Sequence, residues 1–224
     1  SWEEALDFAA DGLSSVKQNL GSNGLAGFGS AKGSNEEAYL FQKLVRTGFG
    51  TNNVDHCTRL CHASSVAALL EGIGSGAVSN QVEDAAHAEV IVVIGANPTG
   101  NHPVAATFIK NAARKGAKLI LMDPRRTELA RHASHFLQFK ADTDVALLNA
   151  MIHTIIDEHL VNEDFITSRT SNFEELCERV KDFSPEEMAP ICGIEADVIR
   201  DCARTYARSK ASIIFWGMGI SQHV

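Results

Sequence analysis

The sequence lacks an excess of basic residues, since 20 Lys and Arg stand against 28 Asp and Glu and the formal net charge is −8. Proteins that bind nucleic acid neutralise phosphates with clustered Lys and Arg, and no such cluster is present. The sequence also lacks an apolar run near the roughly 18 residues that a membrane-spanning helix needs. We therefore expect no nucleic-acid partner and no membrane span in this chain.

Cysteine is scarce, and its count of five is odd. An odd count in a chain of 224 residues does not indicate a disulfide framework and favours a reducing compartment. The first residues have the pattern of an amphipathic helix, without a signal peptide or an initiator Met. The sequence therefore predicts a cytoplasmic protein, and a chain cut from a longer one whose upstream signals are not visible.

The hydrophobic content of 45% is sufficient for a substantial core. The first part of the chain alternates between helical periodicity and Gly-rich turns. In its second helix we expect Tyr39, Leu40, Leu44 and Val45 to face inward. The predicted elements are helices at residues 2–20, 35–47 and 62–71, a short strand near residues 25–28, and a loop over residues 48–55.

Beyond residue 88 the pattern changes. Residues 89–94 are dominated by a continuous β-branched run, which is typical of a strand buried on both faces. Strands then alternate with helices, and this order predicts a parallel sheet with helices on both faces. The further predicted elements are strands at residues 118–122, 136–139 and 212–216, helices at residues 103–115, 144–158 and 195–208, and a helix with Ser184 as its N-cap.

Residues 55–62, Asp-His-Cys-Thr-Arg-Leu-Cys-His, concentrate groups that can do chemistry. A thiolate such as that of Cys61 is a soft ligand for a transition metal, and a helix start and the nearby Arg59 favour its ionised form. The adjacent His62 can carry a proton near neutral pH. The alternative is a pair of buried cysteines with a capping His, because C-x3-C-H is not a standard zinc or iron–sulfur spacing. Spacing alone favours that alternative.

Polar or Gly-rich turns follow three of the predicted strands, where parallel sheets bind their ligands. A tight turn of Gly95 and Asn97 exposes backbone N–H groups for a phosphate or a ribose. Asp123 can accept hydrogen bonds from a ribose or a guanine edge, and Arg125 or Lys32 can pair with a diphosphate. Asn-Pro and Asp-Pro are also plain turn formers, an alternative that the residues leave open. The first turn has no G-x-G-x-x-G pattern, which argues against an NAD site of the usual kind.

Several segments, in the right order, resemble one family. Residues 51–66, TNNVDHCTRLCHASSV, closely resemble the active-site segment of formate dehydrogenases, which belong to the molybdopterin oxidoreductases. Residues 30–37 are similar to the family's pterin-binding loop. The segments that resemble its nucleotide-binding turns are residues 95–98, 123–125, 142–144 and 217–219.

The resemblance implies an enzyme that oxidises formate to carbon dioxide and passes the electrons to an iron–sulfur chain. The implied cofactors are bis-molybdopterin guanine dinucleotide with molybdenum or tungsten, and a 4Fe-4S cluster in a missing N-terminal part. Cys61 stands at the family's metal-ligand position and His62 at the active-site His of formate dehydrogenases, whereas Cys57 matches no family ligand. The implied cofactor-binding residues are Lys32, Asn35, Gly95, Asn97, Asp123, Arg125, Asp142, Gly217, Met218 and Gln222.

The implied fold class is α/β, a Rossmann-like parallel sheet domain with part of a second α/β domain, as in domains 1–3 of formate dehydrogenase and DMSO reductase. Residues 57–224 form the domain that binds the guanine dinucleotide, and residues 1–56 belong to a domain that missing sequence completes. The expected partners are formate and iron–sulfur subunits linked to NAD or ferredoxin, and the isolated piece is expected to be inactive.

Two alternatives remain at this stage. One is another molybdopterin oxidoreductase such as a nitrate reductase, against which His62 argues, because that segment typically lacks His after the cysteine. The other is a metal-free electron-transfer subunit of the same fold, against which the pair Cys61 and His62 argues.

Overall fold

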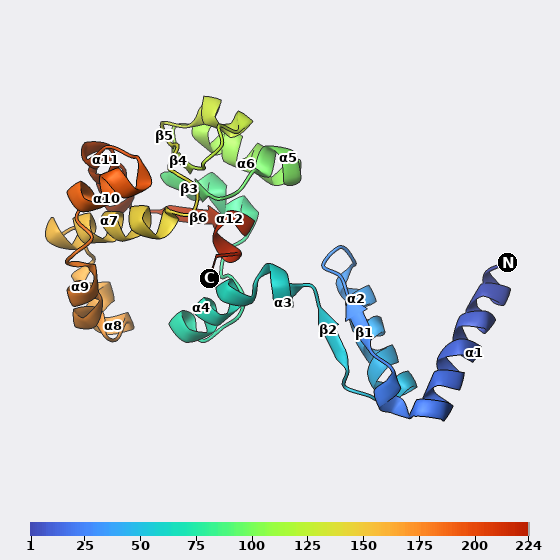
Figure 1. Ribbon diagram of the computed structural model, residues 1–224. Coiled ribbons are helices and arrows are strands. Elements are labelled where there is room, and N and C mark those ends of the chain that lie inside the picture. The colour runs from blue at the N-terminus through green and yellow to red at the C-terminus, as the bar shows by residue number, and fades with distance from the viewer. Residues whose placement is uncertain (224) are drawn as a thin grey trace. The chain divides into compact units, whose positions relative to one another are not determined.

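The computed structural model describes residues 1–223, which fall into two units, residues 1–67 and the residues from 68 onward. Figure 1 shows the elements of both units. The α/β class expected from the sequence is confirmed, because parallel sheets and helices make up both units. The domain boundary between residues 56 and 57 stays a prediction.

The first unit begins with the helix α1 (Trp2–Leu20), as predicted. Ser1 and Glu4 form a capping box, in which each side chain accepts from the other residue's backbone, and this satisfies N–H groups at the start of the helix. The helix ends at Gly21, whose φ of 74° is open to glycine at little cost. None of its residues is buried.

A two-stranded parallel sheet and a helix form the rest of this unit. Strand β1 (Gly27–Gly29) pairs in register with β2 (Val54–His56), so that Gly29 lies opposite His56. Strand β2 lies where the sequence predicts a loop, because three residues are too few to carry a periodic signal. The remaining elements are η1 (Ser22–Gly24), α2 (Asn35–Lys43), the π-helical turn η2 (Leu44–Phe49), α3 (Thr58–Cys61) and α4 (Ala63–Ile73), which extends beyond the first unit.

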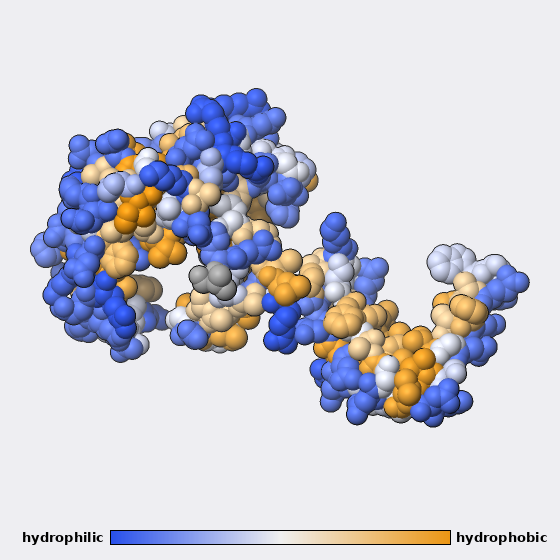
Figure 2. Space-filling model, in the orientation of Figure 1, coloured by the Kyte–Doolittle hydropathy of each residue, from blue (hydrophilic) through white to orange (hydrophobic). Residues whose placement is uncertain are grey.

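The prediction of an inward face on the second helix is correct for one residue and wrong for three. Val45 is fully buried, whereas Tyr39, Leu40 and Leu44 are 65%, 59% and 49% exposed. Leu40 and Leu44 line an open hollow of about 790 Å³. Helical periodicity marks a face that packs against something, but among residues 1–67 that face is left uncovered. Figure 2 shows apolar side chains at the surface of this unit.

The second unit is built on a four-stranded parallel sheet in the order β5-β4-β3-β6, which confirms the predicted parallel sheet. Its strands are β3 (Val90–Ile94), β4 (Lys118–Met122), β5 (His135–Leu137) and β6 (Ser212–Trp216). Its helices are η3 (Val82–His87), α5 (Pro98–Asn101), α6 (Pro103–Arg114), η4 (Glu128–His132), α7 (Asp144–Asp157), α8 (Glu163–Arg169), α9 (Phe173–Val180), α10 (Pro185–Cys192), α11 (Ala196–Ala207) and α12 (Met218–Ser221).

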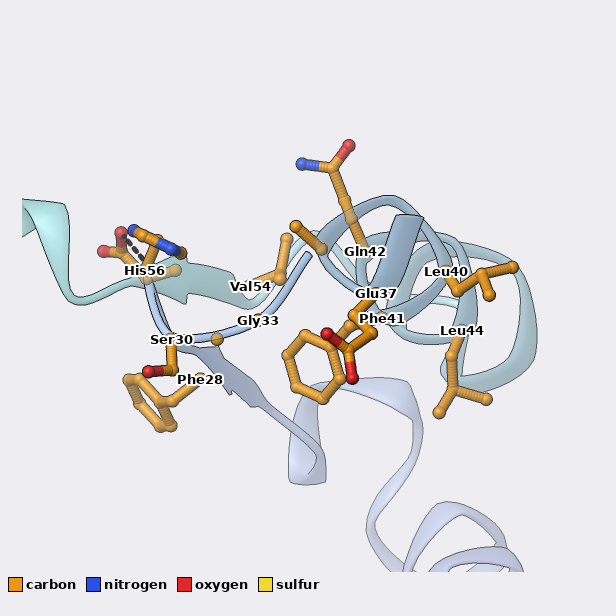
Figure 3. A pocket seen from close by; sticks show the side chains of 13 residues that line it. Phe28, Ser30, Gly33, Glu37, Leu40, Phe41, Gln42, Leu44, Val54 and His56 are labelled. Carbon is orange, nitrogen blue, oxygen red and sulfur yellow. Dashed lines mark hydrogen bonds between the residues drawn. The ribbon is translucent and has the colours of Figure 1, made fainter. Parts of the chain in front are cut away.

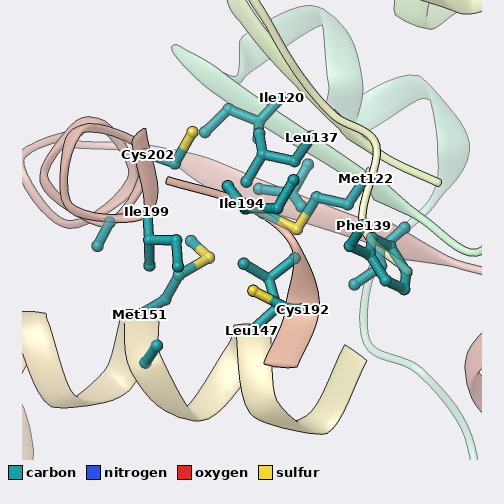
Figure 4. Close-up of a cluster of buried hydrophobic side chains, with 14 of the residues drawn as sticks. Ile120, Met122, Leu137, Phe139, Leu147, Met151, Cys192, Ile194, Ile199 and Cys202 are labelled. Carbon is teal, nitrogen blue, oxygen red and sulfur yellow. The ribbon is translucent and has the colours of Figure 1, made fainter. Parts of the chain in front are cut away.

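Alternate residues of the buried strand β3 face opposite cores. Val92 packs into one cluster with Leu147 of α7 and Ile199 of α11 (Figure 4), whereas Val93 packs into another with Ile109 of α6. All five residues of β3 are buried, as the β-branched run predicts. Helices therefore cover both faces of the sheet.

An ion pair joins the two helices over the first of these cores. Arg204 of α11 donates two hydrogen bonds of 2.7 Å to the Glu158 carboxylate that follows α7, and this lowers the pKa of Glu158. We expect Glu158→Gln to reduce the free energy of unfolding by about 0.5–1 kcal/mol at pH 7, because the pair is partly exposed.

The effect of Glu158→Gln should depend on pH. Because the folded-state pKa of Glu158 lies below the unfolded one, the stabilisation is present above the unfolded pKa and is lost as the pH falls through the folded pKa. Urea unfolding of both proteins at pH 7 and at pH 3 measures this difference. An equal difference at both pH values would contradict the ion pair as its cause.

Candidate functional site

The segment with the two candidate catalytic residues forms a tight double turn. The amides of Leu60 and Cys61 both donate to the Cys57 carbonyl at 3.0 Å. The amide of His62 donates to Thr58 at 2.9 Å, and its carbonyl accepts from Val66 at 2.8 Å. Cys61 therefore ends α3, and His62 lies between α3 and α4 with its backbone held on both sides.

The surroundings of Cys61 differ from the prediction in two respects. Cys61 is a free, half-buried thiol at the end of the one-turn helix α3 and two residues before α4, so it does not begin a helix. The predicted cation Arg59 donates to the Asp55 carboxylate at 3.2 Å and is paired there. The His56 amide and then Arg59 lower the pKa of Asp55. His62 is exposed to solvent.

The side chain of His56 fixes the start of α3. The Thr58 amide donates to His56 Nδ1 at 3.1 Å, and the Thr58 hydroxyl lies 2.8 Å from the same nitrogen. Nδ1 of His56 therefore acts as the acceptor for the Thr58 amide. No sequence pattern predicts this contact.

The loop of residues 30–34 carries the candidate Lys32, which is exposed. It ends in a capping box between Ser34 and Glu37, and Asn35, the next candidate, is the exposed first residue of α2. The Ala31 amide donates to Cys57 Sγ at 3.3 Å, so the loop is bound to the segment that leads to Cys61. Strands β1 and β2 and helix α2 line the hollow beside this loop (Figure 3).

In the second unit, three strands of the sheet end at the same level. Ile94 lies in register with both Met122 and Trp216, so the residues after them, Gly95 and Asp123 among them, form one row. The Gly95 amide donates to the Met122 carbonyl at 3.0 Å. This amide is used within the sheet and is therefore not one of the exposed N–H groups expected in the turn of Gly95 and Asn97. Figure 1 shows α12 leaving this edge after β6.

Glycines make a close backbone contact at this edge. The Gly219 amide donates to the Gly95 carbonyl at 3.0 Å. A Cβ on Gly95 would lie 2.9 Å from the Gly219 carbonyl carbon, and one on Gly217 would lie 2.6 Å from Gly95 O. Gly95 also has a φ of 57°. At position 95, only glycine both fits the small space and readily adopts the positive φ. Gly219 lies within the predicted turn but was missing from the candidate residues.

We expect Gly95→Ala to lower the free energy of unfolding of the second unit by about 3 kcal/mol, from backbone strain and the contact with Gly219 together. Gly74 is the matched control, because its φ is 72° and nothing lies within 4 Å of a built Cβ. Gly74→Ala should cost about 1 kcal/mol, the strain alone. Urea unfolding followed by the fluorescence of Trp216 in β6 measures both. Equal losses would show that the contact with Gly219 contributes nothing.

The carboxylate of Asp123 stabilises the turn after β4. Asp123, which is 6% exposed, accepts from the Arg125 amide at 2.7 Å through Oδ1. One carboxylate oxygen is thus used to shape the turn, and the Arg125 side chain is exposed. Asn97 lies at the N-cap of α5, where its Oδ1 accepts from the Thr99 hydroxyl at 2.8 Å.

The turn before α7 contains the predicted residues 142–144, of which Asp144 was missing from the candidate residues. Asp142 has a φ of 66°, and Asp144, whose side chain is 4% exposed, lies 2.9 Å from His223 Nδ1. That contact lacks hydrogen-bond geometry, so Asp144 Oδ1 has no hydrogen-bond donor among residues 1–223. Met218 and Gln222 lie in and directly after α12, beside His223 in the chain. A polar residue at the first position of a predicted helix was the available signal.

The comparisons with known proteins agree over the whole chain. The family model described as molybdopterin oxidoreductase matches residues 1–224. The chain belongs to the molybdopterin oxidoreductase family. This confirms the resemblance stated from its motifs.

Among the curated members of the family, the chain is 43% identical over 223 residues to formate dehydrogenase H of Escherichia coli (strain K12). It is 40% identical over 222 residues to the F420-dependent formate dehydrogenase subunit alpha of Methanocaldococcus jannaschii. These matches cover 99% of the chain but 31% and 32% of the two relatives. The chain thus spans about a third of the length of the curated relatives it matches.

A solved structure has the same fold. The acetylene hydratase from Pelobacter acetylenicus matches with a TM-score of 0.78 and 27% identity, over 99% of this chain and 30% of that one.

The residues present fit a molybdopterin cofactor. Cys61 offers a free thiol, a donor type that a transition metal accepts. In the second unit, the buried Asp144 Oδ1 accepts no hydrogen bond from residues 1–223. Within residues 1–223, no three His, Cys, Asp or Glu side chains gather as a metal-binding group, and no helix is both long and apolar enough to cross a membrane.

Proposed function

We propose that this chain is the central part of the catalytic subunit of a molybdenum- or tungsten-dependent formate dehydrogenase, which oxidises formate to carbon dioxide. The observation that carries the proposal is the pair Cys61 and His62 on one backbone turn, in a chain whose relatives are named formate dehydrogenases. The proposal covers the whole subunit, because the chain spans only part of those relatives.

The proposed chemistry releases one proton and two electrons from each formate. A bound molybdenum or tungsten centre supplies the two-electron redox chemistry. Cys61 would hold the metal through its thiolate, and the double hydrogen bonding at the Cys57 carbonyl keeps the Cys61 backbone in place. The imidazole of His62, next in the chain and exposed to solvent, would take the proton and pass it to water.

The second unit would hold the guanine dinucleotide part of the cofactor at the level strand ends. Support comes from the strand ends at Ile94, Met122 and Trp216, which lie at the same level, and from the carboxylate oxygens of Asp123 and Asp144. A guanine edge offers N–H donors that such carboxylates bind. Lys32 and Asn35 of the first unit and Gly95, Asn97, Arg125, Asp142, Gly217, Met218 and Gln222 of the second complete the proposed set of cofactor-binding residues.

Further sequence of the same subunit would complete the first unit. The exposed apolar side chains of α1 and α2, among them Phe8 at 83% and Tyr39 at 65%, are the support for this proposal. A 4Fe-4S cluster and iron–sulfur partners, linked to NAD or ferredoxin, would carry the electrons away. The five free cysteines are in keeping with a reducing, cytoplasmic location.

The test is elemental analysis of the full-length subunit, purified without oxygen, together with formate-dependent dye reduction on the same sample. Molybdenum or tungsten near one atom per subunit, with formate activity, is the expected result and names the metal. Nitrate reduction without formate oxidation would assign another reaction of the family. A folded sample without either metal would instead indicate a metal-free electron-transfer subunit.

A further inference from the structure

Two segments leave the two-stranded sheet of the first unit at the same end. Gly29 lies opposite His56 in the register, so the loop of residues 30–34 and the segment that starts at Cys57 begin side by side. Figure 3 shows Ser30 and His56 at this end. One segment carries Lys32 and the other carries Cys61.

Cys57 connects these two segments through two different atoms. Its Sγ accepts the Ala31 amide at 3.3 Å, and its carbonyl oxygen accepts the Cys61 amide at 3.0 Å. The other hydrogen bonds of the loop are local, such as that from the Lys32 amide to Ser30 Oγ at 3.2 Å. Cys57 thus lies between the backbone of residue 31 and the backbone of residue 61.

The neighbours of the Cys57 side chain restrict its position. It is half-buried at the N-cap position of α3, and Sγ lies 3.8 Å from His56 Nδ1. His56 is in turn fixed by the Thr58 amide. Because its neighbours on both sides are held, the thiol has little freedom to turn away from Ala31.

We propose that Cys57 is a positioning residue, which sets the Lys32 loop relative to the Cys61 segment by accepting the Ala31 amide. It does not touch the metal and contributes no proton. The inference rests on the proposed function only in its consequence for turnover, because the hydrogen bond itself belongs to this chain whatever the reaction.

Three substitutions separate the acceptor from the rest of the side chain. Cys57→Ala removes the acceptor, Cys57→Val removes it while keeping most of the volume, and Cys57→Ser keeps an acceptor of similar size. Cys177→Ala is the control, since it removes a half-buried thiol of the second unit, on α9.

The first readout is amide hydrogen exchange of the peptide that contains Ala31, measured by mass spectrometry on the full-length subunit. We expect Cys57→Ala and Cys57→Val to raise its exchange rate about fivefold to tenfold, the factor that one hydrogen bond of ordinary net strength provides. Cys57→Ser should restore the wild-type rate, and Cys177→Ala should leave it unchanged. Wild-type exchange in both acceptor-free variants would overturn the proposal.

The second readout is the metal content and steady-state kinetics of the same samples. We expect Cys57→Ala to keep its metal and to lose about tenfold in kcat with an unchanged KM for formate, and Cys57→Ser to recover most of the loss. Loss of the metal would make Cys57 a ligand and overturn the positioning role. Faster exchange in Cys57→Ala, in a subunit whose wild type does not oxidise formate, would support the positioning role and contradict the proposed function.

Discussion

Cys61→Ala is expected to abolish formate oxidation and to remove molybdenum or tungsten from the full-length subunit. Cys61 has a free thiol at the end of α3, and the methyl group of alanine cannot bind a metal. The fold should remain, because the backbone bonds of the turn run to the Cys57 carbonyl and not to the Cys61 side chain. Elemental analysis and dye reduction measure the two losses on one sample.

The control for this prediction is a comparison of thiols. Cys177→Ala removes a half-buried thiol of the second unit and should retain both metal and activity. The free energy of unfolding of Cys61→Ala should change by less than about 1 kcal/mol, as for substitutions at incompletely buried positions. Formate oxidation retained in Cys61→Ala would remove Cys61 from the role of metal ligand.

His62→Ala is expected to lower the turnover rate with formate by roughly 100-fold or more, the scale of a positioned acid–base group. The backbone of His62 is held by Thr58 and Val66, so the loss should come from the missing imidazole and not from a displaced turn. The metal content should be unchanged. Steady-state rates from pH 5 to pH 9 measure both the size of the loss and the change in the pH profile.

Another exposed histidine supplies the comparison for His62. His87 lies in η3 of the second unit and is exposed, and His87→Ala should keep the wild-type rate and pH profile. An unchanged rate in His62→Ala would show that another group or water, and not His62, takes the proton released from formate. Loss of metal in His62→Ala would instead indicate a structural role at the metal site.

The core strands were predictable because their buried apolar residues are consecutive in the sequence. The run at residues 89–94 predicts β3, and residues 212–216 coincide with β6. Short strands carry no such signal, so β2 was predicted as a loop. Strand β5 ends at Leu137 and not at the predicted residue 139, although Phe139 is buried in the same core cluster as Leu137. Periodicity also cannot say whether a packing partner lies among the described residues, as Tyr39 shows.

The residue types of the candidate site follow from motif resemblance, but its contacts do not. The resemblance named Cys61 and His62, whose roles stay predictions, and the family match confirms the resemblance itself. The hydrogen bond from Ala31 to Cys57, 26 residues apart, depends on the pairing of β1 with β2, whose register no sequence pattern predicts. The approach of Gly219 to Gly95 likewise depends on the pairing of β3 with β6.

The pairing of β3 with β6 has a consequence for synthesis on the ribosome. Val90 pairs with Ser212. One edge of the wholly buried strand β3 therefore stays unpaired during synthesis until more than a hundred further residues have been made. Until then its backbone N–H and C=O groups and apolar side chains are open to other chains, as in proteins dominated by distant contacts. A chaperone that shields the nascent second unit should therefore raise the yield of folded protein more than slower translation of the first unit would.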